Sequence, residues 1–186
     1  MRKAVSQMAK VSVRSLCAGD QHWLYQAAQD TGLNYWFIGK PEPYLPEHAH
    51  RFVSEKITDR PYPDYRMGIF VDGEGSGGIN LRQSDHDKSK HLLSYWIVPK
   101  HQRKGVAFAA VSEFLRIMDM LHPWLKICAT VETTNQPSIK LLSKLGFDEV
   151  GTCLIQAKNR RAGELIEAFK FVRKQGIRFL PEGDTA

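Results

Sequence analysis

Residues 95–110 read YWIVPKHQRKGVAFAA, and this stretch decides how the rest of the chain is interpreted. A run of β-branched and aromatic residues leads into it and stops at Pro99, which is typical of a buried strand. From Val106 onward the apolar residues recur at helical spacing, until the pair His122-Pro123 ends the pattern. The stretch therefore predicts a strand, a sharp turn and a long helix.

The turn between this strand and helix has features of an anion-binding site. Four of its side chains are basic or can become so: Lys100, His101, Arg103 and Lys104. A helix start carries unpaired N–H groups and a partial positive charge, and Gly105 lets a ligand approach the backbone. An ordinary turn with a solvated basic face has the same composition, and the spacing is not that of a Walker A loop. Both interpretations stay open on the turn alone.

Composition limits the classes of protein that the chain can belong to. With 186 residues, 42% apolar and 25% charged, it fits one soluble globular domain. The net charge of +6 favours an anionic ligand or surface but does not distinguish a nucleotide from a nucleic acid. Cys17, Cys128 and Cys153 form no CxxC pair and no disulfide framework, so we expect a reducing compartment and no metal site. We expect neither a signal peptide nor a membrane span, and a cytoplasmic location.

The chain alternates between strand and helix patterns. We expect strands at 11–16, 65–71, 77–81, 91–98, 125–131, 147–156 and 165–172, and helices at 20–28, from residue 46, from residue 106 and at 137–145. The aromatic segment 34–45 is either a wall of a substrate pocket or a hydrophobic plug. We expect an N-terminal extension (1–10), one domain (11–172) and a loosely held polar tail (173–186).

Three motifs then follow in a fixed order: Gln102-x-x-Gly105-x-Ala107, Asn135-Gln136-Pro137-Ser138 and Lys144-Leu145-Gly146-Phe147. Together they resemble the GNAT superfamily of acetyl-CoA-dependent N-acetyltransferases, and the closest branch looks like the RimJ/RimL-like ribosomal-protein N-acetyltransferases. The resemblance implies an α/β (α+β) fold, with a mixed, mostly antiparallel twisted sheet of about seven strands and about four helices. The fourth and fifth strands would splay apart, with the thioester between them.

The resemblance also implies residues that hold acetyl-CoA. The backbone of Ile97 and Val98 would bind the pantetheine arm as an added strand does. Backbone N–H groups of the turn would hold the diphosphate, from Gln102, Arg103, Lys104, Gly105, Val106 and Ala107. Asn135 would reach the cofactor, cap its helix, or do both. Lys140 or Lys144 would meet the 3′-phosphate, unless each is a plain solvated lysine.

For catalysis, the resemblance makes the Val98 N–H the oxyanion donor and Ser138 the acid or relay for the leaving thiolate. The alternative for Ser138 is an ordinary first-turn helix serine. Many relatives carry Glu where this chain has Leu92, and a tyrosine acid where it has Leu142; neither leucine can move a proton. Strand alternation sends His91 to the face opposite Leu92, where we expect a surface histidine.

These features together predict an N-acetyltransferase in which a primary amine attacks the thioester directly. A site without a strong base suits an α-amine, with a pKa of about 7.7–8.0, better than a lysine side chain at about 10.4. A protein N-terminus is therefore one candidate acceptor. A small amine, polyamine or antibiotic is an alternative, and so is a non-catalytic acyl-CoA sensor. We expect no nucleic-acid or membrane partner, and a monomer or homodimer.

Overall fold

The computed structural model describes residues 9–30, 32–33, 41, 43–54, 64–156 and 163–174. Its strands form one seven-stranded sheet in the order β1-β2-β3-β4-β5-β7-β6. The strands are β1 (Val11–Ser15), β2 (Tyr65–Val71), β3 (Glu74–Gln83), β4 (Lys90–Ile97), β5 (Lys126–Glu132), β6 (Phe147–Gln156) and β7 (Leu165–Arg173). Neighbouring strands are antiparallel except β4 and β5, which are parallel. The predicted mixed, mostly antiparallel sheet is confirmed.

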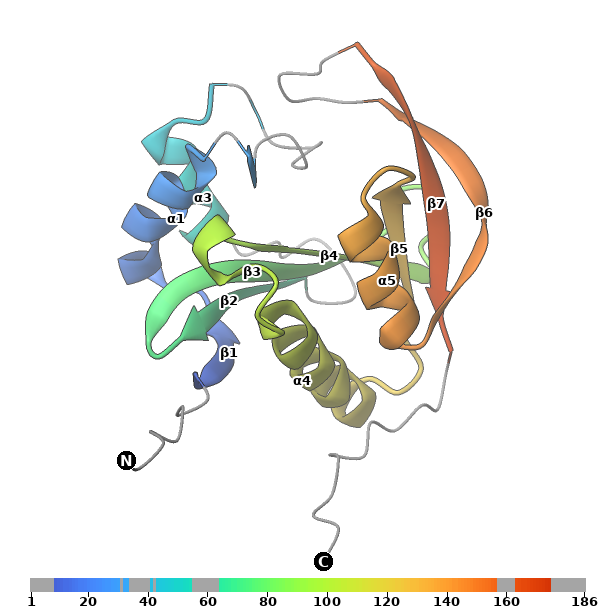
Figure 1. Cartoon of the computed structure of the whole chain (residues 1–186), viewed down its shortest axis with the longest axis horizontal. Helices are drawn as coiled ribbons and strands as arrows, with labels where there is room; N and C mark the ends of the chain where they lie inside the picture. Colours follow the sequence, from blue (N-terminus) through green and yellow to red (C-terminus); the bar gives the residue numbers. More distant parts are fainter. Residues whose placement is uncertain are drawn as a thin grey trace, which may run out of the picture.

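The described helices are α1 (Gln21–Ala28), α3 (Pro46–Ser54), α4 (Val106–Leu121) and α5 (Gln136–Lys144), with short 3-10 turns η1 (Ala18–Asp20) and η2 (Pro99–His101). In Figure 1, α1 and α3 lie side by side near the β2–β3 turn, while α4 and α5 stand beside the middle of the sheet. None of the helices in these described ranges is long and apolar enough to cross a bilayer.

Helix α4 supplies one side of the core. Its fully buried residues Phe114 and Leu115 belong to one apolar cluster with Ile79 and Leu81 of β3. The predicted apolar face extended to Leu121, but that side chain is 54% exposed because it is the last residue of the helix. The core therefore holds α4 against the strands that precede it in sequence.

The β2–β3 hairpin is tighter than the sequence predicted. Its turn consists of Asp72 and Gly73 alone, which have positive φ values of 50° and 85°. Strand β3 therefore begins at Glu74 instead of residue 77, and a bulge at Ser76 absorbs the extra residue.

The sheet opens between β4 and β5. Within the described ranges, these strands pair only at Lys90–Leu92 with Lys126–Cys128, and their remaining residues diverge. The two halves of the sheet therefore diverge beyond these residues and form a wedge; Figure 1 shows the half made of β5, β7 and β6 turned away from the half made of β1 to β4. This confirms the predicted splay.

The C-terminal boundary of the fold lies beyond the predicted one. Arg173 was expected to begin a loosely held tail, but it is the last residue of β7 and only 8% exposed. Its backbone pairs with Phe147 of β6, and its side chain binds Asp119 of α4. These contacts make Arg173 part of the packed domain.

Candidate functional site

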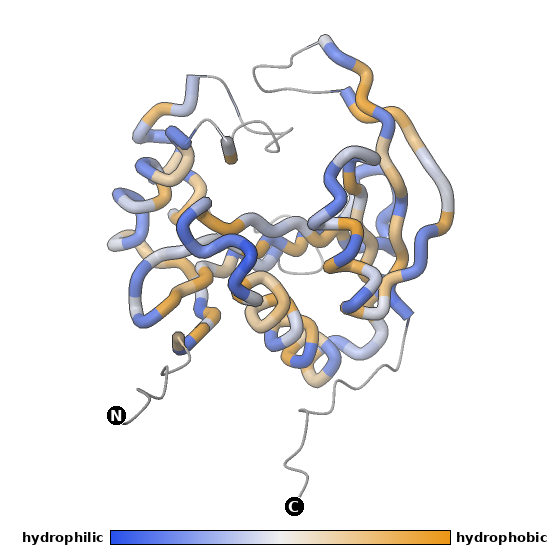
Figure 2. Tube along the Cα trace, viewed as in Figure 1, coloured by the Kyte–Doolittle hydropathy of each residue, from blue (hydrophilic) through white to orange (hydrophobic). Residues whose placement is uncertain are grey.

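The turn between β4 and α4 has a backbone shaped to receive an anion. Arg103 and Gly105 have positive φ values of 60° and 78°, and the first bond inside α4 runs from the Ala109 N–H to the Gly105 carbonyl (3.0 Å). The N–H groups of the first helical turn, starting at Val106, therefore have no acceptor within the helix. A Cβ built on Gly105 meets no described atom within 4 Å, so the mouth of the helix is open. In Figure 2 this turn is a hydrophilic segment that leads into the largely apolar helix α4.

The side chains of this turn divide into two groups. Lys100 forms an ion pair with Glu74, and Arg103 and Lys104 are exposed. Gln102 has a different role from the one predicted: its N–H donates to the Pro99 carbonyl (3.1 Å) and its side-chain amide donates to the Ile97 carbonyl (2.8 Å). Gln102 thus closes the end of β4, and its N–H is used within the turn.

Two backbone hydrogen bonds fix which groups of β4 face the wedge. The Val98 N–H donates to the Ser76 carbonyl (2.8 Å), and at the other end the Ser84 N–H donates to the Lys90 carbonyl (2.9 Å). In an antiparallel pair, residues alternate between those bonded to the partner strand and those whose groups point away. The even-numbered residues of β4 therefore bond β3, while the N–H of Ile97 points toward the wedge. The prediction of a ligand-facing Val98 N–H is wrong for this reason.

The N-terminus of α5 lies across the wedge from β4. Asn135 caps this helix, because its side-chain oxygen accepts the Ser138 N–H at 3.3 Å. The Ser138 hydroxyl is 2.8 Å from the Tyr95 hydroxyl of β4, and Tyr95 also approaches the Ser138 carbonyl at 3.4 Å. Burial raises the pKa of Tyr95 to about 12, with the hydrogen bond to Ser138 opposing the shift. The sequence analysis did not identify Tyr95.

A second link joins α5 to the start of α4, next to the β4–α4 turn. The Lys144 ammonium lies 4.2 Å from the centroid of the Phe108 ring, in the first turn of α4. Lys140 is exposed on α5. Of the two lysines considered for the 3′-phosphate, only Lys144 has a described contact with the start of α4.

Leu142 and Leu92 stand where the sequence resemblance implied a tyrosine acid and a glutamate base. Leu142 is completely buried in the core, and Leu92 lines a cavity. His91 is on the opposite face from Leu92, as expected, but it is 3% exposed and not a surface residue. That face also carries Leu93 and is covered by the core. Burial lowers the pKa of His91, while the charge of Asp64 opposes the shift.

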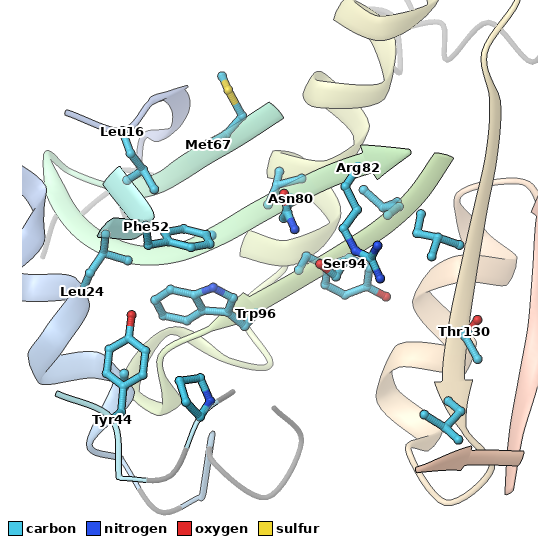
Figure 3. A pocket seen from close by; sticks show the side chains of 18 of the residues that line it. Leu16, Leu24, Tyr44, Phe52, Met67, Asn80, Arg82, Ser94, Trp96 and Thr130 are labelled. Atoms are coloured by element: carbon cyan, nitrogen blue, oxygen red, sulfur yellow. The ribbon is translucent and has the colours of Figure 1, made fainter. Parts of the chain in front are cut away.

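A cavity of about 680 Å³ lies on the Leu92 face of the sheet, and it reaches across the wedge to Thr130 of β5. In Figure 3, Tyr44, Phe52 and Trp96 form an aromatic group at one end, and Arg82, Asn80 and Ser94 lie between them and Thr130. The described lining residues include no aspartate or glutamate. Arg82 is their only lysine or arginine; its side chain is 40% exposed and bonds Asp85 at 3.0 Å.

The cavity tests part of the prediction for the aromatic segment 34–45. Pro41 and Tyr44 line the cavity, as the pocket-wall interpretation expected. Tyr35, Trp36 and Phe37 lie outside the described residues. Sequence reasoning missed the cavity residues of β3 and β4, although the strand period places Ser94 and Trp96 on the same face as Leu92.

The chain is similar to known acetyltransferases both in sequence and in fold. Residues 10–148 match the family described as acetyltransferase (GNAT) domain. The L-amino acid N-acetyltransferase AaaT of Escherichia coli K12 is 26% identical over 144 residues, covering 72% of this chain and 85% of that protein. RimL, a ribosomal L7/L12 α-N-protein acetyltransferase solved with coenzyme A, has a TM-score of 0.72 at 14% identity, covering 88% of this chain and 93% of that one. The Vibrio cholerae spermidine N-acetyltransferase solved with CoA and spermine also gives 0.72, at 18% identity, covering 89% and 95%.

Proposed function

Because the chain belongs to the GNAT acetyltransferase family, we propose that it transfers the acetyl group of acetyl-CoA to the α-amine of an amino acid or peptide. The family supplies the reaction, N-acetylation. The acceptor is inferred from the charges of the cavity, with support from the similarity to AaaT and from the RimL fold.

The donor fits the wedge and the adjoining turn. The open mouth of α4 presents N–H groups and the positive end of a helix dipole, which suit a diphosphate. Exposed Arg103 and Lys104 add charge to the same turn. The backbone of Tyr95 and the N–H of Ile97 face away from β3, beyond the residues that pair with β5, and offer a strand edge for the pantetheine amides. The thioester would then lie between β4 and the first turn of α5.

We infer the class of acceptor from the charges of the described cavity lining, which includes no carboxylate. A polyamine would bring several ammonium groups beside Arg82, whose charge is partly offset by its bond to Asp85, outside the described lining. Two unit charges about 5 Å apart repel by about 3 kcal/mol at an effective dielectric constant near 20, and solvent exposure and the bond to Asp85 reduce this to about 1 kcal/mol. Arg82 instead suits the carboxylate of an amino acid or a peptide carbonyl. The aromatic end suits an apolar side chain of the acceptor.

The reaction follows from these positions. The neutral amine attacks the thioester carbonyl, and the Ile97 N–H, which points into the wedge, stabilises the oxyanion. The C–S bond then breaks, the sulfur takes a proton from Ser138, and the nitrogen loses a proton that returns to Ser138 through solvent. About a tenth of the α-amine at a peptide N-terminus is already neutral near pH 7, so acetylation of that acceptor does not require a strong base.

A thiol-release assay with an acceptor panel tests this function. The panel contains L-leucine, L-phenylalanine, a short peptide with a free N-terminus, its N-terminally blocked lysine-containing counterpart, and spermidine. We expect turnover of the α-amines and a pH profile that follows the pKa of the acceptor. Preference for spermidine or the lysine side chain would contradict the proposal. Binding of acetyl-CoA without thiol release in any reaction would identify a sensor instead.

A further inference from the structure

Resting on the proposed acetyl transfer, we propose that Tyr95 is a positioning residue that directs the Ser138 hydroxyl toward the leaving sulfur. The two residues are 43 positions apart in sequence, and their hydroxyl oxygens are 2.8 Å apart. They come from β4 and α5, on opposite sides of the wedge that would hold the thioester. The hydrogen bond therefore spans the site where the C–S bond breaks.

A serine at this position needs an external partner to direct its proton. The Ser138 N–H is already held by Asn135, which fixes the backbone but leaves the hydroxyl free to rotate. In the arrangement we propose, the Tyr95 O–H donates to Ser138 Oγ (2.8 Å) in preference to the more distant Ser138 carbonyl (3.4 Å), so the serine hydrogen points elsewhere, toward the wedge where the thioester would lie. Tyr95 keeps its own proton throughout the neutral range, because its pKa is raised to about 12 by burial. It is thus a permanent donor that does not itself ionise.

The number of protons is conserved in this step. When the tetrahedral intermediate collapses, the C–S electron pair goes to sulfur, and the Ser138 proton moves to the thiolate. Ser138 Oγ is stabilised meanwhile by the Tyr95 O–H, and it regains a proton from the acylated nitrogen through solvent. The nitrogen therefore loses one proton and the sulfur gains one, without any further reactant.

The first test needs no acceptor. Binding of CoA and of desulfo-CoA, which lacks the sulfur, is measured by calorimetry from pH 7 to pH 10, where a thiol with an ordinary pKa of about 8.5 ionises. We expect the wild-type chain to favour CoA increasingly as the pH rises, by about tenfold, because a hydrogen bond to a charged group is strong. Tyr95→Phe and Ser138→Ala should abolish this preference. Its survival in Tyr95→Phe, or its absence from the wild type, overturns the positioning role.

Tyr65→Phe is the matched control. Tyr65 also has a partly buried hydroxyl, and it bonds His122 Nε2 (2.5 Å). Its loss should lower stability without changing the pH-dependent preference for CoA. A change in Tyr65→Phe as large as that in Tyr95→Phe would show that any buried hydroxyl has this effect, and would overturn the assignment.

The second test is a double-mutant cycle on whichever amine the enzyme accepts. Tyr95→Phe should lower kcat about tenfold with the KM for acetyl-CoA unchanged, and it should have no further effect when Ser138→Ala is present. Independent, multiplying losses contradict action through Ser138. If all amines in the panel fail, the proposed function fails, while the CoA comparison still decides the role of Tyr95.

Discussion

Arg173 at the end of β7 binds Asp119 of α4 through two parallel N–H···O bonds of 2.6 and 2.7 Å. The arginine side chain is 6% exposed, whereas the aspartate side chain is 44% exposed. The pair ties the C-terminal half of the sheet to the helix that begins at the β4–α4 turn. Its geometry is that of a strong charge-assisted interaction, with one partner removed from water.

We expect Asp119→Asn to lower the free energy of unfolding by about 1–3 kcal/mol, because it removes a charge-assisted pair of hydrogen bonds to the buried Arg173. The figure is below that for a fully buried pair because Asp119 is partly solvated. Urea denaturation measures the change. Asp148→Asn is the control, since the Asp148–Lys174 pair is exposed on both sides and its loss should cost less than about 1 kcal/mol. Equal losses in the two variants would contradict the role assigned to Arg173.

His91 makes stability depend on pH. Burial lowers its pKa in the folded chain, so the unfolded chain binds more protons over the range between the two pKa values. Stability contributed by neutral His91 is therefore present above its unfolded pKa of about 6.5 and is lost as the pH falls below it. We expect His91→Gln to flatten this fall in denaturation midpoints measured from pH 8 to pH 5. A difference between wild type and variant that does not change with pH would show that His91 is not the group responsible.

Arg82 should decide which charges the acceptor is allowed to carry. We expect Arg82→Glu to raise kcat/KM for spermidine and lower it for L-leucine, each by about tenfold or more, because the cavity cation becomes an anion. Arg116→Glu, on the exposed face of α4, reproduces the change in net charge away from the cavity. If Arg116→Glu has the same effect on selectivity, the general charge of the protein is responsible and not the cavity.

Much of the fold follows from local patterns in the sequence. Strands β2 and β6 have the predicted bounds, because their limits are set by turn residues and by periodicity along the chain. The bounds of β3 differ from the prediction because of a bulge at Ser76, and a bulge depends on how two strands pair and not on the residues of one strand. His91 and Arg173 are buried because other elements pack over them, and this packing cannot be predicted from the residues next to them in sequence.

The site was predictable where it depends on backbone geometry near one helix start. Gly105 and Asn135 both occupy N-cap positions, which their residue types favour. The Tyr95–Ser138 contact was not predictable, because it joins residues 43 positions apart across the wedge. The direction of the Val98 N–H was predicted wrongly because it depends on which alternate residues of β4 bond to β3, and residue types do not determine this.

The most direct test of donor binding at the mouth of α4 compares two glycine substitutions. Gly105 and Gly73 have similar φ values, 78° and 85°, and no described atom lies within 4 Å of a Cβ built on either. Gly105→Glu and Gly73→Glu should therefore carry a similar backbone cost of about 1–2 kcal/mol. Only Gly105→Glu places a carboxylate where the diphosphate would lie. We expect calorimetry to show acetyl-CoA affinity reduced at least about tenfold in Gly105→Glu and unchanged in Gly73→Glu; wild-type affinity in Gly105→Glu would contradict binding at this turn.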